Sequence, residues 1–350
     1  MAYSTIDKSS LFMNTLLWTG DGGASRSITG VGFQPDMVWI KQRDGANNHM
    51  LADSARGANN KINPNETAAN DTNATSLTAF GADGFTAGTN TEINASGNTY
   101  VAWNWKGGTT SGITTDGATT ITPSAYSFNA DAGISILKYT GNTTAGAKLA
   151  HGLGKVPALF IAKDLGSTES WTVYHQSLGA TKFLSLNGTG AASTSSVRWN
   201  DEDPTTTNMV LGSDTSVNNT SMMGYCFAEV KGFSSFGEYT GTGQLDGPMI
   251  FTGFRPAFVM VKITDTTDGW YMWDNKRSPS GGYNVLQYRL EANQNFAQGT
   301  SANYMIDVVS NGFKLRDNNV GDNGAGNSFV YMAFAAQPLV SSNDKAGTAY

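Results

Sequence analysis

Three histidines, His49, His151 and His175, are the side chains of this 350-residue chain best suited to acid–base chemistry near neutral pH. His49 lies close in sequence to Asp53 and Ser54, which are residue types of a hydrolytic triad. A triad needs three side chains that converge in space, and proximity within one short segment does not provide that geometry. We therefore expect surface or half-buried histidines, no catalytic residues and no enzyme activity.

The segment His151-Gly152-Leu153-Gly154-Lys155 has two glycines before a lysine, as a phosphate-binding loop does. A phosphate loop needs four residues between the glycines, a Ser or Thr after the Lys, and a helix beyond it. Val156 and Pro157 follow here instead. The segment therefore predicts a turn and no cofactor.

The segment Asp201-Glu202-Asp203 places three carboxylates in one predicted loop. Oxygen ligands at such spacing can hold Ca²⁺, but the segment lacks the glycine of the sharp turn in an EF-hand and its closing glutamate. A solvated acidic turn is the preferred interpretation, so no metal site is predicted and calcium binding stays open. Glycoside hydrolysis needs two carboxylates across a cleft, and the sequence identifies no such pair.

Tryptophans are numerous, with 8 in the chain. Trp103 and Trp105 alternate with other residues in a predicted strand, so they point to one face, and Trp171, Trp270 and Trp273 occupy related places in two later segments. Exposed aromatic side chains of a β protein can stack on sugar rings. Burial in a core or between domains is the preferred interpretation, and sugar binding stays open.

The composition favours strands and turns over helices. Charged residues make up 14% of the chain, and Gly alone numbers 41. Gly, Thr, Ser and Asn favour turns and strands. A net charge of −6 argues against nucleic-acid binding, which requires clustered cations.

The sequence has few cysteines and shows no targeting or membrane-spanning segment, and these features bear on where the protein is made and on what stabilises it. Cys226 is the single cysteine, so no disulfide within the chain is expected. Residues 1–17 have no basic segment followed by an unbroken apolar run, and no stretch approaches the ~18 apolar residues of a membrane span. We expect synthesis in a cytoplasm and no membrane insertion.

One block of sequence recurs three times. It opens with an aromatic residue and Thr-Gly, and a Gly-x-x-Pro follows with its Pro 15, 16 and 15 residues after the first Gly. Six residues after the Pro stands a Lys, and twelve residues further an Asp or His. The three sets are Gly20, Pro35, Lys41 and Asp53; Gly141, Pro157, Lys163 and His175; and Gly241, Pro256, Lys262 and Asp274.

Each block predicts a strand that is covered on both faces. Pro suits the start of a strand, and the residues after it are apolar at nearly every position. The final Lys is expected where the strand emerges into water. We expect Trp39, Phe160 and Met260 to occupy equivalent, buried positions. Helical periodicity is nearly absent, so short strands between turns predict a β-sandwich.

The sequence therefore predicts an all-β protein of three tandem, related, jelly-roll-like β-sandwich modules. The expected parts are an N-terminal arm (1–9), module 1 (10–107), a Gly/Thr-rich linker (108–124), module 2 (125–230), module 3 (231–338) and a C-terminal tail (339–350).

Several segments carry a family resemblance: MAYSTID at the start, residues 17–22, 30–41, 53–57 and 100–106, and later residues 253–256 and 310–315. On these segments the chain resembles an uncharacterised domain family of marine tailed phages. Members of that family are usually labelled virion structural or tail-fibre proteins, and no catalytic residues are known for it. The resemblance implies a virion location, other virion proteins as partners and no cofactor.

Three functions stay open. The leading interpretation is a tail-fibre or tail-tip protein that contacts a host surface glycan or receptor. A capsid decoration protein or tail adaptor with a purely structural role is the alternative, and a glycan-degrading tailspike is the third. A homo-oligomer, with a trimer favoured by analogy to fibres, is expected because antiparallel modules leave strand edges that invite association.

Overall fold

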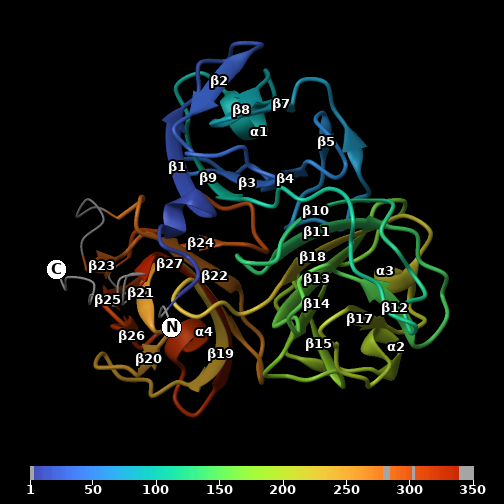
Figure 1. Cartoon of the computed structure of the whole chain (residues 1–350). Helices are drawn as coiled ribbons and strands as arrows, with labels where there is room; N and C mark the ends of the chain where they lie inside the picture. The colour runs from blue at the N-terminus through green and yellow to red at the C-terminus, as the bar shows by residue number, and fades with distance from the viewer. Residues whose placement is uncertain (1–3, 279–283, 302–303, 339–350) are drawn as a thin grey trace.

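Antiparallel sheets grouped in three lobes make up the protein (Figure 1). The computed structural model describes residues 4–278, 284–301 and 304–338. Each α-helix in this described part of the chain is a single turn of four residues, whereas strands run throughout it. The predicted all-β class is confirmed. The expected C-terminal tail (339–350) lies outside the described residues.

The first lobe (residues 4–107, blue to cyan in Figure 1) pairs a sheet of order β1-β9-β3-β4 with a smaller sheet, β2-β8-β7. A short ribbon of β5 and β6, helix α1 and a 3-10 turn complete it. The bounds are η1 Ser9–Leu11, β1 Met13–Thr19, β2 Arg26–Thr29, β3 Met37–Gln42, β4 Met50–Asp53, β5 Asn60–Lys61, β6 Asp71–Thr72, β7 Leu77–Gly81, β8 Gly84–Ala87, α1 Thr91–Asn94 and β9 Thr99–Trp105.

The second lobe (residues 108–230, green to yellow) has a larger sheet of order β10-β11-β18-β13-β14-β15-β16 and a smaller pair, β12-β17. The bounds are β10 Ala125–Asn129, β11 Ile134–Tyr139, β12 Ala147–Ala150, β13 Leu159–Asp164, β14 Thr172–His175, β15 Lys182–Ser185, β16 Ser193–Thr194, α2 Ser196–Trp199, β17 Asn208–Leu211, α3 Thr215–Asn218 and β18 Met222–Phe227.

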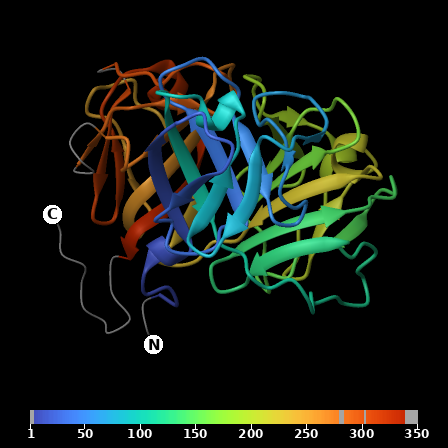
Figure 2. The same ribbon diagram turned by 90° about the horizontal axis from the view of Figure 1, so that it is seen from above.

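The third lobe (the described residues of 231–338, orange to red) has sheets of order β19-β27-β21-β22-β24 and β20-β26-β25-β23. Seen from above, the first lobe lies over the line where the other two meet (Figure 2). The bounds are β19 Ser234–Thr240, β20 Met249–Phe251, β21 Phe254–Ile263, β22 Trp270–Asp274, β23 Val285–Leu286, β24 Leu290–Glu291, β25 Ile306–Val309, β26 Gly312–Leu315, α4 Val320–Asn323 and β27 Ser328–Pro338.

The larger sheets place the strands of the recurring sequence block in one common order. The orders β1-β9-β3-β4, β11-β18-β13-β14 and β19-β27-β21-β22 each set the post-proline strand (β3, β13 or β21) beside the last strand of its lobe, the closing strand (β9, β18 or β27). Pro35 and Pro157 stand two residues before β3 and β13. Pro256 lies inside β21 instead, where the register against β27 shifts. That irregularity accommodates a residue that has no backbone N–H to donate.

The predicted burial of Trp39, Phe160 and Met260 is confirmed, but the predicted equivalence of Phe160 is wrong. Trp39 pairs with Trp103 and Met260 with Met332. In the second lobe the matching pair is Ile161 with Tyr225. Side chains alternate between the two faces of a strand, so Phe160, one residue earlier, points into the opposite core.

The central strands of each larger sheet are buried on both faces, as their apolar runs predicted. Every residue of β3, β13 and β18 is buried. One face packs against the smaller sheet of its own lobe, and these contacts form three separate cores. The other face belongs to a fourth cluster, the central core, which draws residues from all three lobes.

Three aromatic rings meet in the central core, one from the closing strand of each lobe. Trp105 in β9, Phe227 in β18 and Phe334 in β27 have ring centroids 5.9–6.2 Å apart in edge-to-face contacts. They occupy one register position, because their partners Met37, Leu159 and Phe258 are the corresponding residues of the post-proline strands. The lobes therefore share one hydrophobic core and are not independent domains joined only by linkers.

The predicted arm and linker are packed segments. Ile6 of the expected N-terminal arm is buried in the central core. In the expected linker (108–124), Thr109 bridges Phe128, and Ile121 is buried and bridges Leu149. Among the described residues, no helix has the length and apolar character needed to cross a membrane.

Replacing Phe227 by Ala removes a ring that contacts both Trp105 and Phe334 in the central core. We expect the variant to lose about 3–5 kcal/mol of unfolding free energy, as buried Phe→Ala changes do. Phe251→Ala is the matched control, because Phe251 is 70% exposed and should change stability by less than ~0.5 kcal/mol. Urea unfolding measures both, and equal midpoints for the two variants would contradict the shared core.

Candidate binding site at the lobe seams

The three lobes meet at three seams, which we number first (lobes one and two), second (lobes two and three) and third (lobes three and one). The same backbone hydrogen bond crosses each of them. The donor N–H lies in one lobe, after the recurring sequence block. The acceptor carbonyl lies in the next lobe, two residues after the lysine of its block (Lys163, Lys262 or Lys41). The bonds run from Asn70 to Leu165 at 3.0 Å, from Ala192 to Thr264 at 2.8 Å and from Gln298 to Arg43 at 2.7 Å.

A ring N–H crosses each seam in the same way, eight residues after the block lysine. The indole Nε1 of Trp171 donates to the carbonyl of Asn63 at 3.2 Å, and that of Trp270 to the carbonyl of Ser185 at 2.9 Å. His49 occupies the corresponding place at the third seam, with Nε2 3.0 Å from the carbonyl of Glu291. These contacts link lobe one to three, two to one and three to two, so the lobes form a closed ring.

The block lysines lie beneath the seams. We expected them in water, but Lys41, Lys163 and Lys262 are fully buried because the neighbouring lobe covers the strand ends. Lys163 donates to Thr67 and Lys262 to Thr189, each at 3.1 Å across a seam. Burial lowers the pKa of each of the three to about 8. Carbonyl oxygens thus solvate ammonium groups that have lost their water.

The residue twelve places after each lysine also faces the next lobe. Asp53 accepts the hydroxyl of Tyr225 at 2.7 Å, and Asp274 accepts the indole N–H of Trp103 at 3.0 Å. His175 lies 3.1 Å from the carbonyl of Tyr331 through Nε2. The recurrent Asp or His therefore has an interlobe structural role.

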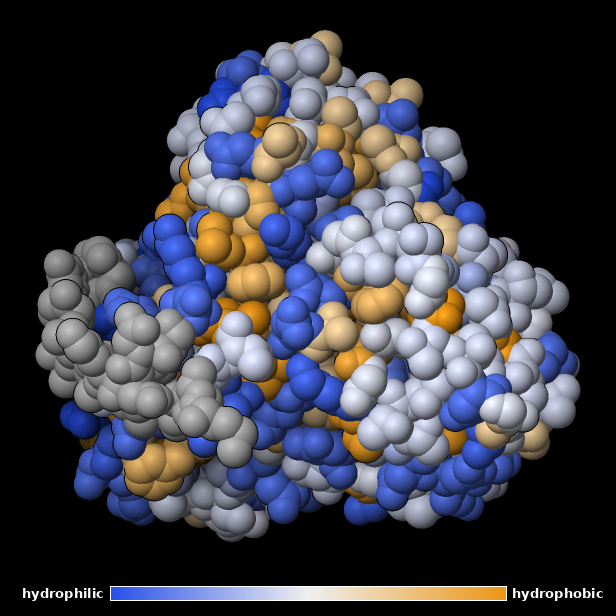
Figure 3. All heavy atoms as spheres, in the orientation of Figure 1, coloured by the Kyte–Doolittle hydropathy of each residue, from blue (hydrophilic) through white to orange (hydrophobic). Residues whose placement is uncertain are grey.

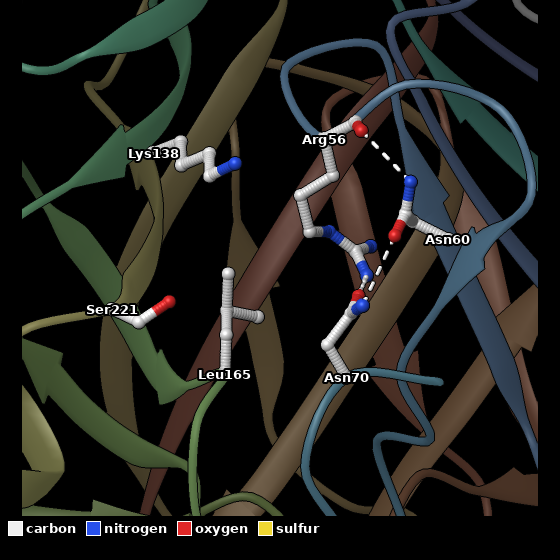
Figure 4. Close-up of a pocket in the computed structure, with 6 residues that line it drawn as sticks. All are labelled: Arg56, Asn60, Asn70, Lys138, Leu165 and Ser221. Atoms are coloured by element: carbon white, nitrogen blue, oxygen red, sulfur yellow. Dashed lines mark hydrogen bonds between the residues drawn. The ribbon is translucent and has the colours of Figure 1, made fainter. Parts of the chain in front are cut away.

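A pocket of about 170 Å³ opens at the first seam (Figure 4). Its lining comes from the loop after β4, from β5 and the loop that follows it, from β11, and from the loops after β13 and before β18. The residues are Arg56, Asn60, Asn70, Lys138, Leu165 and Ser221. It brings two cationic side chains, two amides and a hydroxyl together at one place, with no carboxylate in the lining.

Arg56 lines this pocket, and its guanidinium is held in place by several hydrogen bonds. Its Nε donates to Asp53 at 2.7 Å, its Nη1 to Asn70 at 2.9 Å and its Nη2 to the carbonyl of Leu51 at 3.0 Å. The Arg56–Asp53 pair is almost wholly buried. Burial acts to lower the pKa of Arg56, but the Asp53 charge and hydrogen bonds outweigh it and the pKa is raised.

The second seam carries a pocket at the corresponding place with different chemistry. Its volume is about 350 Å³, and Lys182, Glu238 and Asp265 are its charged lining residues. Glu238 pairs with Val330 as Lys138 pairs with Met223, so an acid replaces the lysine of the first seam. At the third seam, Arg43 donates to the Gln298 side chain at 3.2 Å.

The histidines do not assemble a catalytic site. All three are buried, which corrects the expected surface or half-buried placement. His49 accepts the indole N–H of Trp39 at its Nδ1, and His151 contacts the carbonyl of Thr205. Burial lowers the pKa of His49 well below its ordinary value and those of His151 and His175 to about 4.

The other predicted candidates are also accounted for. Lys155 of the glycine segment donates to the carbonyl of Ala130 at 2.7 Å. In the acidic turn, Glu202 pairs with Lys148, and Asp203 accepts the N–H of Ala180 at 3.1 Å. Within the described ranges, no group of three metal-ligating side chains is assembled. All eight tryptophans are buried, so none is available to stack on a sugar.

The sequence reasoning missed an asparagine that ties each lobe together. Asn94, Asn218 and Asn323 end the single-turn helices α1, α3 and α4. Each side-chain amide donates to a carbonyl six residues earlier, at 3.1, 2.7 and 2.6 Å. Each side-chain oxygen accepts a backbone N–H from the residue after the Thr-Gly pair. The spacing Asn/Asp-x-x-x-Asn is the signal that could have identified them.

A buried acid pair in the third lobe was missed as well. Asp322 stands one residue before Asn323, where α1 has Ile93 and α3 has Val217. Burial and the charge of Asp317 raise the pKa of Asp322 well above its ordinary value. The sequence shows two more acidic residues in a turn, and only the fold reveals that they are enclosed.

The comparisons with known proteins add a family and no activity. Residues 8–338 match a family described as a domain of unknown function, DUF7483. No curated protein and no solved structure matches the chain.

The buried histidines predict a stability that falls with acid. His175 has a pKa of about 4 when folded and ~6.5 when unfolded. Between those values the unfolded chain binds more protons, so unfolding free energy falls as pH drops through this window, by about 1.4 kcal/mol per pH unit for each such histidine. His175→Gln keeps an N–H donor but cannot take up a proton. Measured by urea unfolding between pH 6.5 and 5, the unfolding free energy of this variant should fall less steeply with decreasing pH, by the contribution of one histidine. An unchanged slope would show that His175 is not the titrating group.

Proposed function

Since the chain belongs to the family of domains of unknown function DUF7483, we propose its role from its own geometry and sequence. It is built from three tandem copies of one β-sandwich module (10–107, 125–230 and 231–338). It serves as a non-enzymatic structural protein of a tailed-phage particle, in a tail fibre or tail tip that contacts the host surface.

The closed ring carries this proposal. The same backbone and ring N–H bonds cross all three seams, and the aromatic trio fills the centre. Side chains with catalytic potential are used in these contacts, as His49 and His175 are. Because its histidines and tryptophans make internal contacts, the chain forms a rigid scaffold. Such a scaffold is suited to presenting surface loops.

The location rests on the sequence. Residues 30–41 and 100–106 resemble the marine tailed-phage family, whose members are usually labelled virion structural or tail-fibre proteins. A particle surface favours stable β modules, and assembly in a reducing cytoplasm favours a protein without disulfides. Cys226 is a buried free thiol, consistent with that setting.

Self-association belongs to the proposal, with a trimer favoured by analogy to fibres. One apolar face of each larger sheet, which could have contacted a neighbouring subunit, packs against the other lobes inside one chain. Apolar residues on the face in Figure 3 form small separate patches. Among the described residues, exposed Leu245 and Phe251 in the third lobe and the edge strand β1 are examples of surface available for such a contact.

Counting the protein in purified particles tests the proposed role. Quantitative mass spectrometry against the major capsid protein should find a few to a few dozen copies per particle, and light scattering of the isolated chain should give three times 37.0 kDa. Hundreds of copies would indicate the decoration role instead. Absence from the particle would refute the virion role, and a 37.0 kDa species would refute the trimer.

A further inference from the structure

We propose that the first-seam pocket is a binding site for a small oxyanion, such as the carboxylate of an acidic sugar or a phosphate group. This inference stands on the seam geometry and does not depend on the proposed virion role. Its basis is the convergence of Lys138, Arg56 and Ser221 on one polar cavity (Figure 4).

Lys138 supplies the unbalanced charge. Its side chain is half-buried, and its amino group is turned across the gap toward Arg56 (Figure 4). Among the residues that the structure describes, no hydrogen bond or ion pair occupies this ammonium group. Arg56 is neutralised by its buried ion pair with Asp53. An oxyanion between the two would give Lys138 the partner that the protein itself does not provide.

The neutral side chains are placed to complete such a site. The hydroxyl of Ser221 points into the gap (Figure 4) and has no hydrogen bond within the described part of the chain. The amide of Asn70 is fixed by donating to Asn60 at 3.0 Å and accepting from Arg56 at 2.9 Å. A polar wall that is already ordered loses little entropy when it binds a ligand.

The volume sets the size of the ligand. A single water needs ~10–15 Å³ of such space, so about 170 Å³ accommodates a charged group together with part of the molecule that carries it. Leu165 is the apolar residue of the lining and offers a contact for carbon atoms. A small oxyanion on a short polar scaffold fits this combination.

The second seam serves as an internal control. At the corresponding register Glu238 replaces Lys138, and Asp265 adds another carboxylate. That pocket should repel an oxyanion although it is larger. The preference therefore follows the charge of the side chains and not the presence of a cavity at a seam.

Calorimetric titration of the full chain at low salt tests the site with three probes: sodium glucuronate, inorganic phosphate and neutral glucose. We expect millimolar or tighter binding of glucuronate, phosphate or both, and none of glucose. Glucuronate alone would identify a sugar acid as the ligand class, and phosphate alone a free or esterified phosphate. Binding of neither anion would overturn the proposal.

Two variants locate the binding. Lys138→Met should weaken it at least about ten-fold, since a charge-assisted hydrogen bond is lost. Lys182→Met at the second seam is the matched control and should leave the affinity unchanged. Ser221→Ala, which removes a hydroxyl without changing charge, should weaken binding less. Equal affinity of Lys138→Met and the parent chain, with both melting normally, would overturn the assignment.

Discussion

The rings of Trp105, Phe227 and Phe334 pack around one centre, and this contact determines how the three larger sheets lie against one another. Each ring comes from the closing strand of a different lobe, so each larger sheet must be apolar on both faces. The strand ends are then enclosed by the neighbouring lobe. Polar groups trapped there need partners, because an unpaired buried donor costs free energy. The seam hydrogen bonds, including those of the buried lysines, supply them.

Common backbone contacts leave the seams free to differ in their side chains. The same backbone hydrogen bond is donated by Asn70, Ala192 and Gln298. Their side chains differ, however: Asn70 accepts a hydrogen bond from Arg56 and Gln298 from Arg43, whereas Ala192 has no polar side chain. The cationic pocket of the first seam becomes acidic at the second. A ring of this kind can therefore keep one scaffold while each seam takes on its own chemistry.

The recurring block, the two-sided strands and the all-β class were readable from sequence, because Pro, Lys and apolar runs recur at set intervals. The fate of Lys41, Lys163 and Lys262 was not, since a terminal lysine looks the same whether water or another lobe lies beyond it. The pocket could not be predicted either, because Arg56 and Lys138 are 82 positions apart in the sequence and line one pocket only through the packing of lobes one and two. His175 in an Asp position gave the one hint that this place faces a changing partner.

Scanning calorimetry of the intact chain tests the shared core most directly. If the three lobes depend on one aromatic centre, they unfold in a single transition whose calorimetric enthalpy equals the van't Hoff enthalpy. Separate transitions, each with the enthalpy of about one third of the chain, would show that the lobes are stable alone and would contradict the account.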